Sequence, residues 1–241
     1  MYTPYKATVD NITKHDRPFA GYLYGCFGIN RVYKNQQILN TSVQVGVIGS
    51  NSYAKELQEF IHDIYGFKKA VGWEYQIKNA FALNFNAEYL KTILKTEKNN
   101  FDITWTSNFN LGTVYTNMST GFNARIGLKP LQKLSNSIAF NTSLNNEQNN
   151  SFREVESFFY IKPMLRYAAY DATLQGSFLN KASLVTKELV PLVFDVELGL
   201  RLTVNRFNFG YAFRYNTNKS NDLRFTYGHK YGSITINYLL Y

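Results

Sequence analysis

Apolar and polar residues alternate with a period of two over long parts of this chain. The clearest stretch covers residues 192–204, where every second residue is Leu, Phe or Val and most residues between them are polar or glycine. Residues 206–216 repeat the pattern with Phe and Tyr at the apolar positions, and residues 101–112 and 117–129 show it again. This period predicts β-strands with one apolar and one polar face.

About ten such strands are predicted. Their expected ranges are 18–31, 36–48, 71–94, 100–113, 116–129, 154–168, 170–180, 189–204, 206–217 and 223–241. The segments between several of them are rich in Asn, Glu, Lys and Ser, which is typical of loops. No linker between domains interrupts the series, so we expect a single domain over residues 1–241.

Strand length distinguishes the two fold classes that show this alternation. Strands of soluble β-sandwiches usually have about 5–6 residues, whereas a tilted strand that crosses a bilayer needs about 9–11. The stretch 192–204 has 13 residues, and the 19 Tyr and 19 Phe of the chain suit aromatic girdles at the two membrane interfaces. These features favour an all-β fold, an antiparallel transmembrane β-barrel, over a sandwich.

Other sequence features exclude several alternatives. No run approaches the roughly 18 apolar residues of a transmembrane helix. The single cysteine, Cys26, cannot form an internal disulfide and rules out cysteine-based zinc sites. Residues 1–6 lack the charged and apolar regions of a secretory signal, so either the chain stays in the cytoplasm or its natural N-terminus lies upstream.

One segment breaks the strand pattern and predicts a short helix at residues 52–65. Its apolar residues recur at helical spacing, Asn51 or Ser52 can cap its start, and Gly66 suits its end. A short helix in an all-β chain is expected in a loop or across a barrel mouth, where functional residues often lie.

Gln58 and His62 are four residues apart and therefore share one face of this helix. The pair could provide a histidine general base that activates water and an amide donor for a developing oxyanion. The alternative is a surface histidine without a role. The other two histidines, His15 and His229, have no ligand-like spacing to His62, so the histidines do not predict a metal site.

Several segments together resemble one protein family. They are Met1–Pro4, Asp16–Tyr24, Gln58–His62, Gly72–Gln76 with Asn79, Gly112–Gly121, Arg125–Gly127 and His229–Ile234. These segments span nearly the whole chain, and they resemble the outer-membrane lipid A 3'-O-deacylases. The joint occurrence of the Asp-Arg-Pro-Phe-Ala-Gly block and the Gln/His helix is the most specific part of the resemblance.

The resemblance implies a twelve-stranded barrel in the bacterial outer membrane with its active site near the extracellular leaflet. It implies calcium-dependent hydrolysis of an ester, which removes the 3'-linked acyloxyacyl group of lipid A. By position, His62 corresponds to the general base and Gln58 to its polar neighbour. A family lysine corresponds to Lys6 or Lys14, and we favour Lys6.

Two departures from the family pattern stand out. The family's calcium-site Asn-Asp pair and a site threonine lie in two strands upstream of the motif that begins at Met1, so we expect an N-terminally truncated chain whose metal ligands cannot be named here. Translation of the upstream DNA tests this expectation. Lys68, six residues after His62, stands where we expect an acidic residue in at least one family member, which puts charge balance or metal binding at this corner in question.

The net charge of +9 suits an anionic partner such as lipid A within lipopolysaccharide, among other outer-membrane lipids. We expect a monomer. The alternative function is a non-enzymatic barrel, a porin or surface-binding protein that has lost the calcium site. A nucleic-acid partner is not expected, because the aromatic residues lie on long apolar faces and not among the basic ones. Arg125 and Arg201 lie at polar positions and are expected to pack in the lumen.

Overall fold

The computed structural model describes residues 1–9, 11–140, 155–221 and 228–238. In this part of the chain nine antiparallel strands form one sheet, and each strand pairs with its neighbours in sequence. The strands are β1 (Tyr22–Tyr33), β2 (Gln37–Ile48), β3 (Ala80–Lys95), β4 (Phe101–Gly112), β5 (Tyr115–Gly127), β6 (Glu156–Asp171), β7 (Leu192–Val204), β8 (Phe207–Asn216) and β9 (His229–Tyr238). The helices are α1 (Ala54–Tyr65) and α2 (Ala172–Gln175), with 3-10 turns η1 (Ile12–Lys14), η2 (Ser50–Ser52), η3 (Trp73–Tyr75), η4 (Leu134–Asn136) and η5 (Ile138–Phe140).

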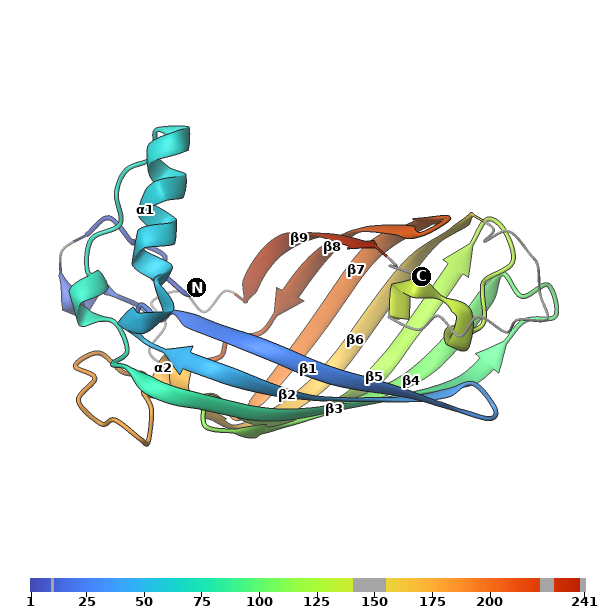
Figure 1. Cartoon of the computed structure of the whole chain (residues 1–241), viewed down its shortest axis with the longest axis horizontal. Helices are drawn as coiled ribbons and strands as arrows, with labels where there is room; N and C mark the ends of the chain where they lie inside the picture. Colours follow the sequence, from blue (N-terminus) through green and yellow to red (C-terminus); the bar gives the residue numbers. More distant parts are fainter. Residues whose placement is uncertain (10, 141–154, 222–227, 239–241) are drawn as a thin grey trace.

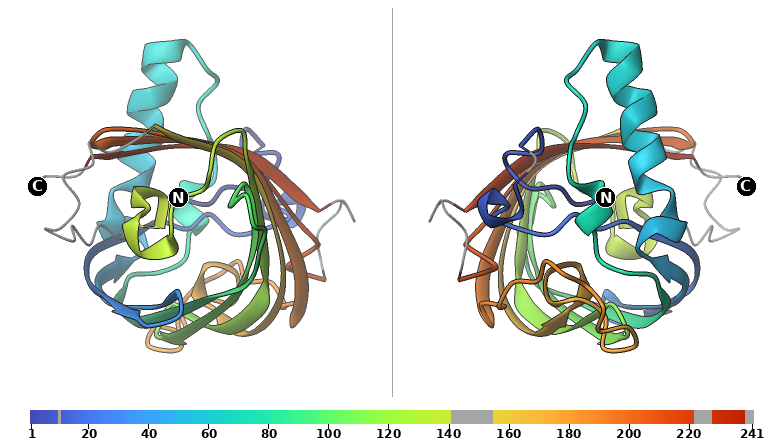
Figure 2. Two further views of the ribbon diagram at one scale, coloured as in Figure 1. Left: turned by 90° about the vertical axis from the view of Figure 1, so that its right-hand side faces the viewer. Right: turned by 90° about the vertical axis from the view of Figure 1, so that its left-hand side faces the viewer.

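The sheet curves around a lumen and forms a half-barrel with β1 and β9 as its edges (Figures 1 and 2). Its strands are 10 to 16 residues long, which is enough to cross a bilayer at a tilt. The predicted fold class, an antiparallel β-barrel with one short helix near residues 52–65, is confirmed. Within the described residues, none of the helices has the length and apolar character needed to span a membrane.

The burial of side chains shows which face of the sheet is outside. In β8 the aromatic residues Phe207, Phe209 and Tyr211 are exposed, whereas the alternate residues Asn208 and Ala212 are buried. A soluble sandwich would bury the aromatic side of each strand. Here the apolar side points outward and the polar side faces the lumen, which is the arrangement of a membrane barrel.

The predicted strand at 170–180 is wrong, and the described residues contain nine strands and not ten. Strand β6 ends at Asp171, whose carboxylate accepts a hydrogen bond of 2.9 Å from Thr173 N–H and so caps α2. Gly176, with φ of 80°, then ends this short helix. Capping by Asp171 therefore replaces further strand pairing. Residues 223–227 and 239–241 of the predicted strand 223–241 lie outside the described residues.

The start of the predicted helix also differs in detail. Tyr53, in a left-handed conformation, precedes α1, and no side chain caps the helix. Asn51 and Ser52 belong to the preceding turn, where the Ser52 hydroxyl donates instead to the carbonyl of Gly49 at 2.6 Å. The end at Gly66 is as predicted.

The two ends of the half-barrel are closed by different segments. At the end that carries α1, residues 1–9 and 11–20 lie across the mouth, with Tyr2 bridged to Ala20 (Figure 2). At the opposite end, residues 131–140 fold into the lumen, where Leu134 packs with Ile38 and Leu90.

Candidate active site

Helix α1 follows β2 and rises steeply away from the strands at one end of the sheet (Figure 1). Lys55 Nζ and Glu59 Oε1 lie 3.9 Å apart on its surface, an i,i+4 pair that adds little stability. The helix ends at Gly66, which has φ of 66° and whose N–H bonds to the His62 carbonyl. Glycine takes this left-handed conformation without strain, so the chain turns back sharply after Tyr65.

This turn orients the His62 ring. The Lys68 carbonyl oxygen lies 2.7 Å from His62 Nδ1. Because a carbonyl oxygen only accepts hydrogen bonds, Nδ1 must carry the proton. In the neutral ring Nε2 therefore holds a free lone pair, and it makes no hydrogen bond within the described residues. The partly exposed ring thus presents the nitrogen that a general base needs.

One turn earlier on the helix, Gln58 is held by Trp73. Trp73 Nε1 donates a hydrogen bond of 2.8 Å to Gln58 Oε1, and both side chains are buried. Since an indole N–H only donates, this bond identifies the oxygen of the Gln58 amide, and the amide nitrogen keeps its two N–H donors. Gln58 and His62 share a helix face, so this face combines a base with a neighbouring donor.

The N-terminal segment packs against the Trp73 ring. The Trp73 ring packs on Phe19 with ring centroids 4.9 Å apart, and Phe19 contacts buried His15 edge to face at 5.5 Å. Gly72, with φ of 111°, lies against these rings, and a Cβ there would come within 2.5 Å of His15 Cε1. Packing between segments distant in sequence therefore determines where Gln58 points.

Lys68 acts on His62 through its main chain. Its side chain is exposed, and it is the carbonyl oxygen that contacts the His62 ring. A backbone carbonyl is present whatever the side chain, so the departure from an acidic residue at this position leaves the ring orientation intact.

Lys6 and Lys14 both lie in the N-terminal segment and are exposed. The side-chain ammonium group of neither lysine forms a hydrogen bond or ion pair within the described residues. The Ala7 carbonyl accepts a hydrogen bond of 2.7 Å from Val71 N–H, so Lys6 lies next to the loop that follows α1. No side-chain contact joins either lysine to α1 in the described part of the chain, and a role for Lys6 in the site stays a prediction.

A second face of α1 is apolar and exposed. Large side chains of the helix and of the turn after it are more than half exposed: Leu57, Phe60, Ile64, Tyr65 and Phe67. In a membrane protein such a face fits the acyl region or the headgroup boundary of the bilayer. The His62 and Gln58 face lies beside it on the same helix.

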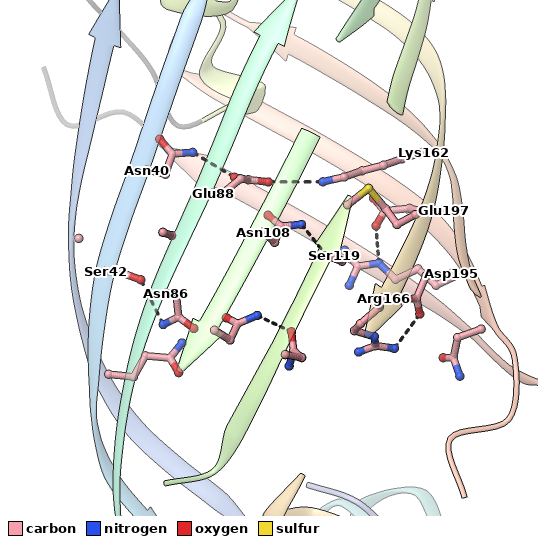
Figure 3. Close-up of a pocket in the computed structure, with 18 of the residues that line it drawn as sticks. Asn40, Ser42, Asn86, Glu88, Asn108, Ser119, Lys162, Arg166, Asp195 and Glu197 are labelled. Carbon is pink, nitrogen blue, oxygen red and sulfur yellow. Dashed lines mark hydrogen bonds and ion pairs between the residues drawn. The ribbon is translucent and has the colours of Figure 1, made fainter. Parts of the chain in front are cut away.

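The lumen contains a cavity of about 690 Å³ that sequence reasoning did not identify as a site. Strands β2 to β5 line it mainly with amide and hydroxyl side chains, and strands β6 to β8 line it with charged ones (Figure 3). Three ion pairs cross or flank it: Lys162 with Glu88 at 3.4 Å, Arg166 with Asp195 at 2.9 Å, and Arg214 with Glu197 at 2.6 Å. The polar positions of the strands could have indicated these residues from the sequence. Two of the ion pairs join neighbouring strands, and only Lys162 with Glu88, from β6 and β3, depends on the curvature of the barrel.

The two arginines at polar positions face inward as expected. Arg125 is fully buried and bonds Asp102 through Nε at 2.9 Å, and Arg201 donates to Asn208 at 3.3 Å. Among the described residues, no group of three or more His, Cys, Asp and Glu side chains is arranged to hold a metal ion.

Comparisons with known proteins agree with this fold. The family model of outer membrane protein LpxR matches residues 1–240. Among solved structures, LpxR from Salmonella typhimurium superposes with a TM-score of 0.79 at 16% sequence identity, over 99% of this chain and 80% of that one. No curated protein sequence gave a significant match. The chain therefore belongs to the LpxR family of outer-membrane proteins.

Proposed function

We propose that this protein is a lipid A 3'-O-deacylase in which His62 is the general base. The observation that supports the proposal most directly is the bond from His62 Nδ1 to the Lys68 carbonyl, which leaves Nε2 as the basic nitrogen. Membership of the LpxR family supports an action on lipid A in the outer membrane.

In the proposed reaction, His62 Nε2 removes a proton from a water molecule, and the water oxygen attacks the ester carbonyl carbon. The tetrahedral intermediate expels the sugar 3' oxygen, which takes the proton from His62. The products are a free acyloxyacyl acid and a sugar hydroxyl. The hydrogen bond from Nδ1 to the Lys68 carbonyl persists throughout and stabilises the imidazolium form.

Gln58 has the complementary role of oxyanion donor. Its amide oxygen is occupied by Trp73, so the N–H groups are the part of the side chain available to substrate. A preorganised donor of this kind contributes about 10²–10³ in rate.

The apolar face of α1 supports the choice of a lipid substrate. An ester buried at the base of acyl chains is reachable only by a catalytic group at the same depth. The exposed Leu57, Phe60 and Ile64 let α1 enter the apolar boundary of the membrane, and His62 lies on the same helix.

Calcium is part of the proposal through the family resemblance alone. The described residues do not include a cluster able to hold a metal ion, so we assign no ligand and derive no step through calcium. Assaying with a calcium chelator, and again after calcium is added back, tests the requirement.

Mass spectrometry of lipid A from cells producing the protein tests the proposal. We expect loss of the 3'-linked acyloxyacyl group with the wild-type protein, and a rate about 10²–10⁴-fold lower with His62→Ala. Heat-modifiable gel migration shows that each variant is folded in the membrane. Unchanged lipid A in cells with folded wild-type protein would contradict the proposal and favour a non-enzymatic barrel.

A further inference from the structure

The mouth of the lumen near the loop after β8 gathers cationic side chains from three segments. Lys219 comes from this loop, Arg166 from β6, and Arg17 from the N-terminal segment. Lys219 and Arg166 line the lumen cavity, whereas Arg17 is buried and is not among the lining residues. No residue of α1 lines this cavity, so the cluster is distinct from the His62 face.

Lys219 is held in place by its main chain. Its carbonyl oxygen accepts a hydrogen bond of 2.9 Å from Val190 N–H, and the next residue, Ser220, bridges to Leu189. Within the described residues the Lys219 ammonium group makes no hydrogen bond and no ion pair. A fixed backbone therefore presents an unpaired cation to the cavity.

The two arginines are only partly satisfied. Arg166 Nη2 bonds Asp195 at 2.9 Å, but its Nε is buried without a hydrogen-bond partner in the described part of the protein. Arg17 stacks over the Tyr2 ring at 4.6 Å, makes two long hydrogen bonds to Thr173, and likewise has an unpartnered buried Nε. Buried donors without partners cost free energy, which a bound acceptor would recover.

The charges around Lys219 leave positive charge to be neutralised. Asp195 is paired with Arg166, and the Asp171 carboxylate accepts two hydrogen bonds from Thr173. Burial and the nearby Arg166 lower the pKa of Lys219 to about 8, although Asp171 and Asp195 act in the opposite direction. Lys219 is thus still mostly charged at neutral pH, at a position that disfavours an unneutralised cation.

We propose that Lys219 and Arg166, backed by the charge of Arg17, form a binding site for a phosphate group at the lumen mouth. Lys219 is the cation left without a carboxylate partner within the described residues, and a phosphate group both neutralises it and offers several oxygens to hydrogen-bond donors at once. Arg166 Nε and the Lys219 ammonium group are the donors it would meet. The phosphate could belong to free phosphate or to a phosphorylated lipid headgroup.

The site is tested by titrating the folded protein in detergent with inorganic phosphate and measuring the heat of binding by calorimetry. We expect Lys219→Gln to weaken phosphate binding about tenfold or more, and Lys219→Arg to retain it. Lys162→Gln is the matched control, because Lys162 lines the same cavity but is already paired with Glu88. This control should bind phosphate like the wild type.

Two results would overturn the proposal: no phosphate binding by the folded wild-type protein, or equal binding by wild type and Lys219→Gln. Competition with diphosphorylated lipid A micelles distinguishes the sources. Displacement of phosphate assigns the site to a lipid headgroup, and its absence assigns the site to free phosphate. Neither readout requires ester hydrolysis, so the outcome does not depend on the role of His62.

Discussion

At the end of the lumen away from α1, Arg125 is fully buried between two carboxylates. Its Nη2 lies 2.5 Å from Asp102, its Nη1 lies 3.6 Å from Glu156, and both acids are themselves buried. At the α1 end, Lys219 has no such partner among the described residues, and His62 keeps one ring nitrogen free.

The difference between the ends separates polar groups that neutralise one another from polar groups that are open to a ligand. Asp102 and Arg125 are direct register partners on β4 and β5, so the pair ties two strands together. Glu156 extends the network to the inward loop by accepting hydrogen bonds from Gln132 and Ser137. The charges of Asp102, Arg125 and Glu156 neutralise one another and stabilise the fold, whereas the Lys219 ammonium group and His62 Nε2 have no partner among the described residues and are available to a ligand.

The largest effect on stability is expected from Arg125→Met. This variant leaves Asp102 and Glu156 buried without their cation, which should lower the free energy of unfolding by about 3–5 kcal/mol. Thermal unfolding in detergent, followed by circular dichroism, measures the change. The double variant Arg125→Met, Asp102→Leu should recover part of the loss, and an Arg125→Met protein as stable as wild type would contradict the structural role.

At the α1 end, Gln58→Glu should lower the deacylation rate about 10²–10³-fold. The carboxylate can still accept the Trp73 hydrogen bond, but it no longer donates to an oxyanion. Rates from lipid A mass spectrometry, compared with unfolding curves of the same variant, separate a loss of rate from a loss of stability. Full activity of Gln58→Glu would exclude the amide as oxyanion donor.

At the proposed phosphate site, a change of pH should alter phosphate affinity, and this effect is expected to be smaller than the loss of rate in Gln58→Glu. Lys219 is faced by Arg17, Arg166, Asp171 and Asp195, and its pKa is lowered to about 8. It is charged below that pH and neutral above it, so phosphate affinity should fall as the pH rises through about 8. Titrations between neutral and alkaline pH test this, and Lys219→Arg should bind without that decline because arginine stays charged.

The smallest effect is expected from Lys68→Ala, which removes a side chain but keeps the carbonyl that orients His62. Lipid A should be deacylated at a rate within about twofold of wild type, as for most surface substitutions. A large loss of activity would show that the Lys68 side chain has a role of its own.

Local patterns were sufficient for much of the fold. Alternation placed most strands close to their observed ranges, and Gly66 ended the helix as predicted. The mistaken strand at 170–180 shows the limit of prediction from alternation. Over a few residues, helix capping by the Asp171 side chain competes with strand pairing. The prediction that Asn51 or Ser52 caps the helix was wrong for a similar reason, because the Ser52 hydroxyl donates to the Gly49 carbonyl instead.

The sequence by itself determined the period of the strands, the outward apolar face, and the helix face shared by Gln58 and His62. These follow from local geometry, in which side-chain direction depends only on spacing along the chain. Only the tertiary structure decided that the Lys68 carbonyl contacts His62, that Trp73 bonds Gln58, and that Lys219 and Arg166 line one cavity. Those contacts depend on how a turn closes or on how distant strands curve around one lumen, and no spacing along the sequence encodes that curvature.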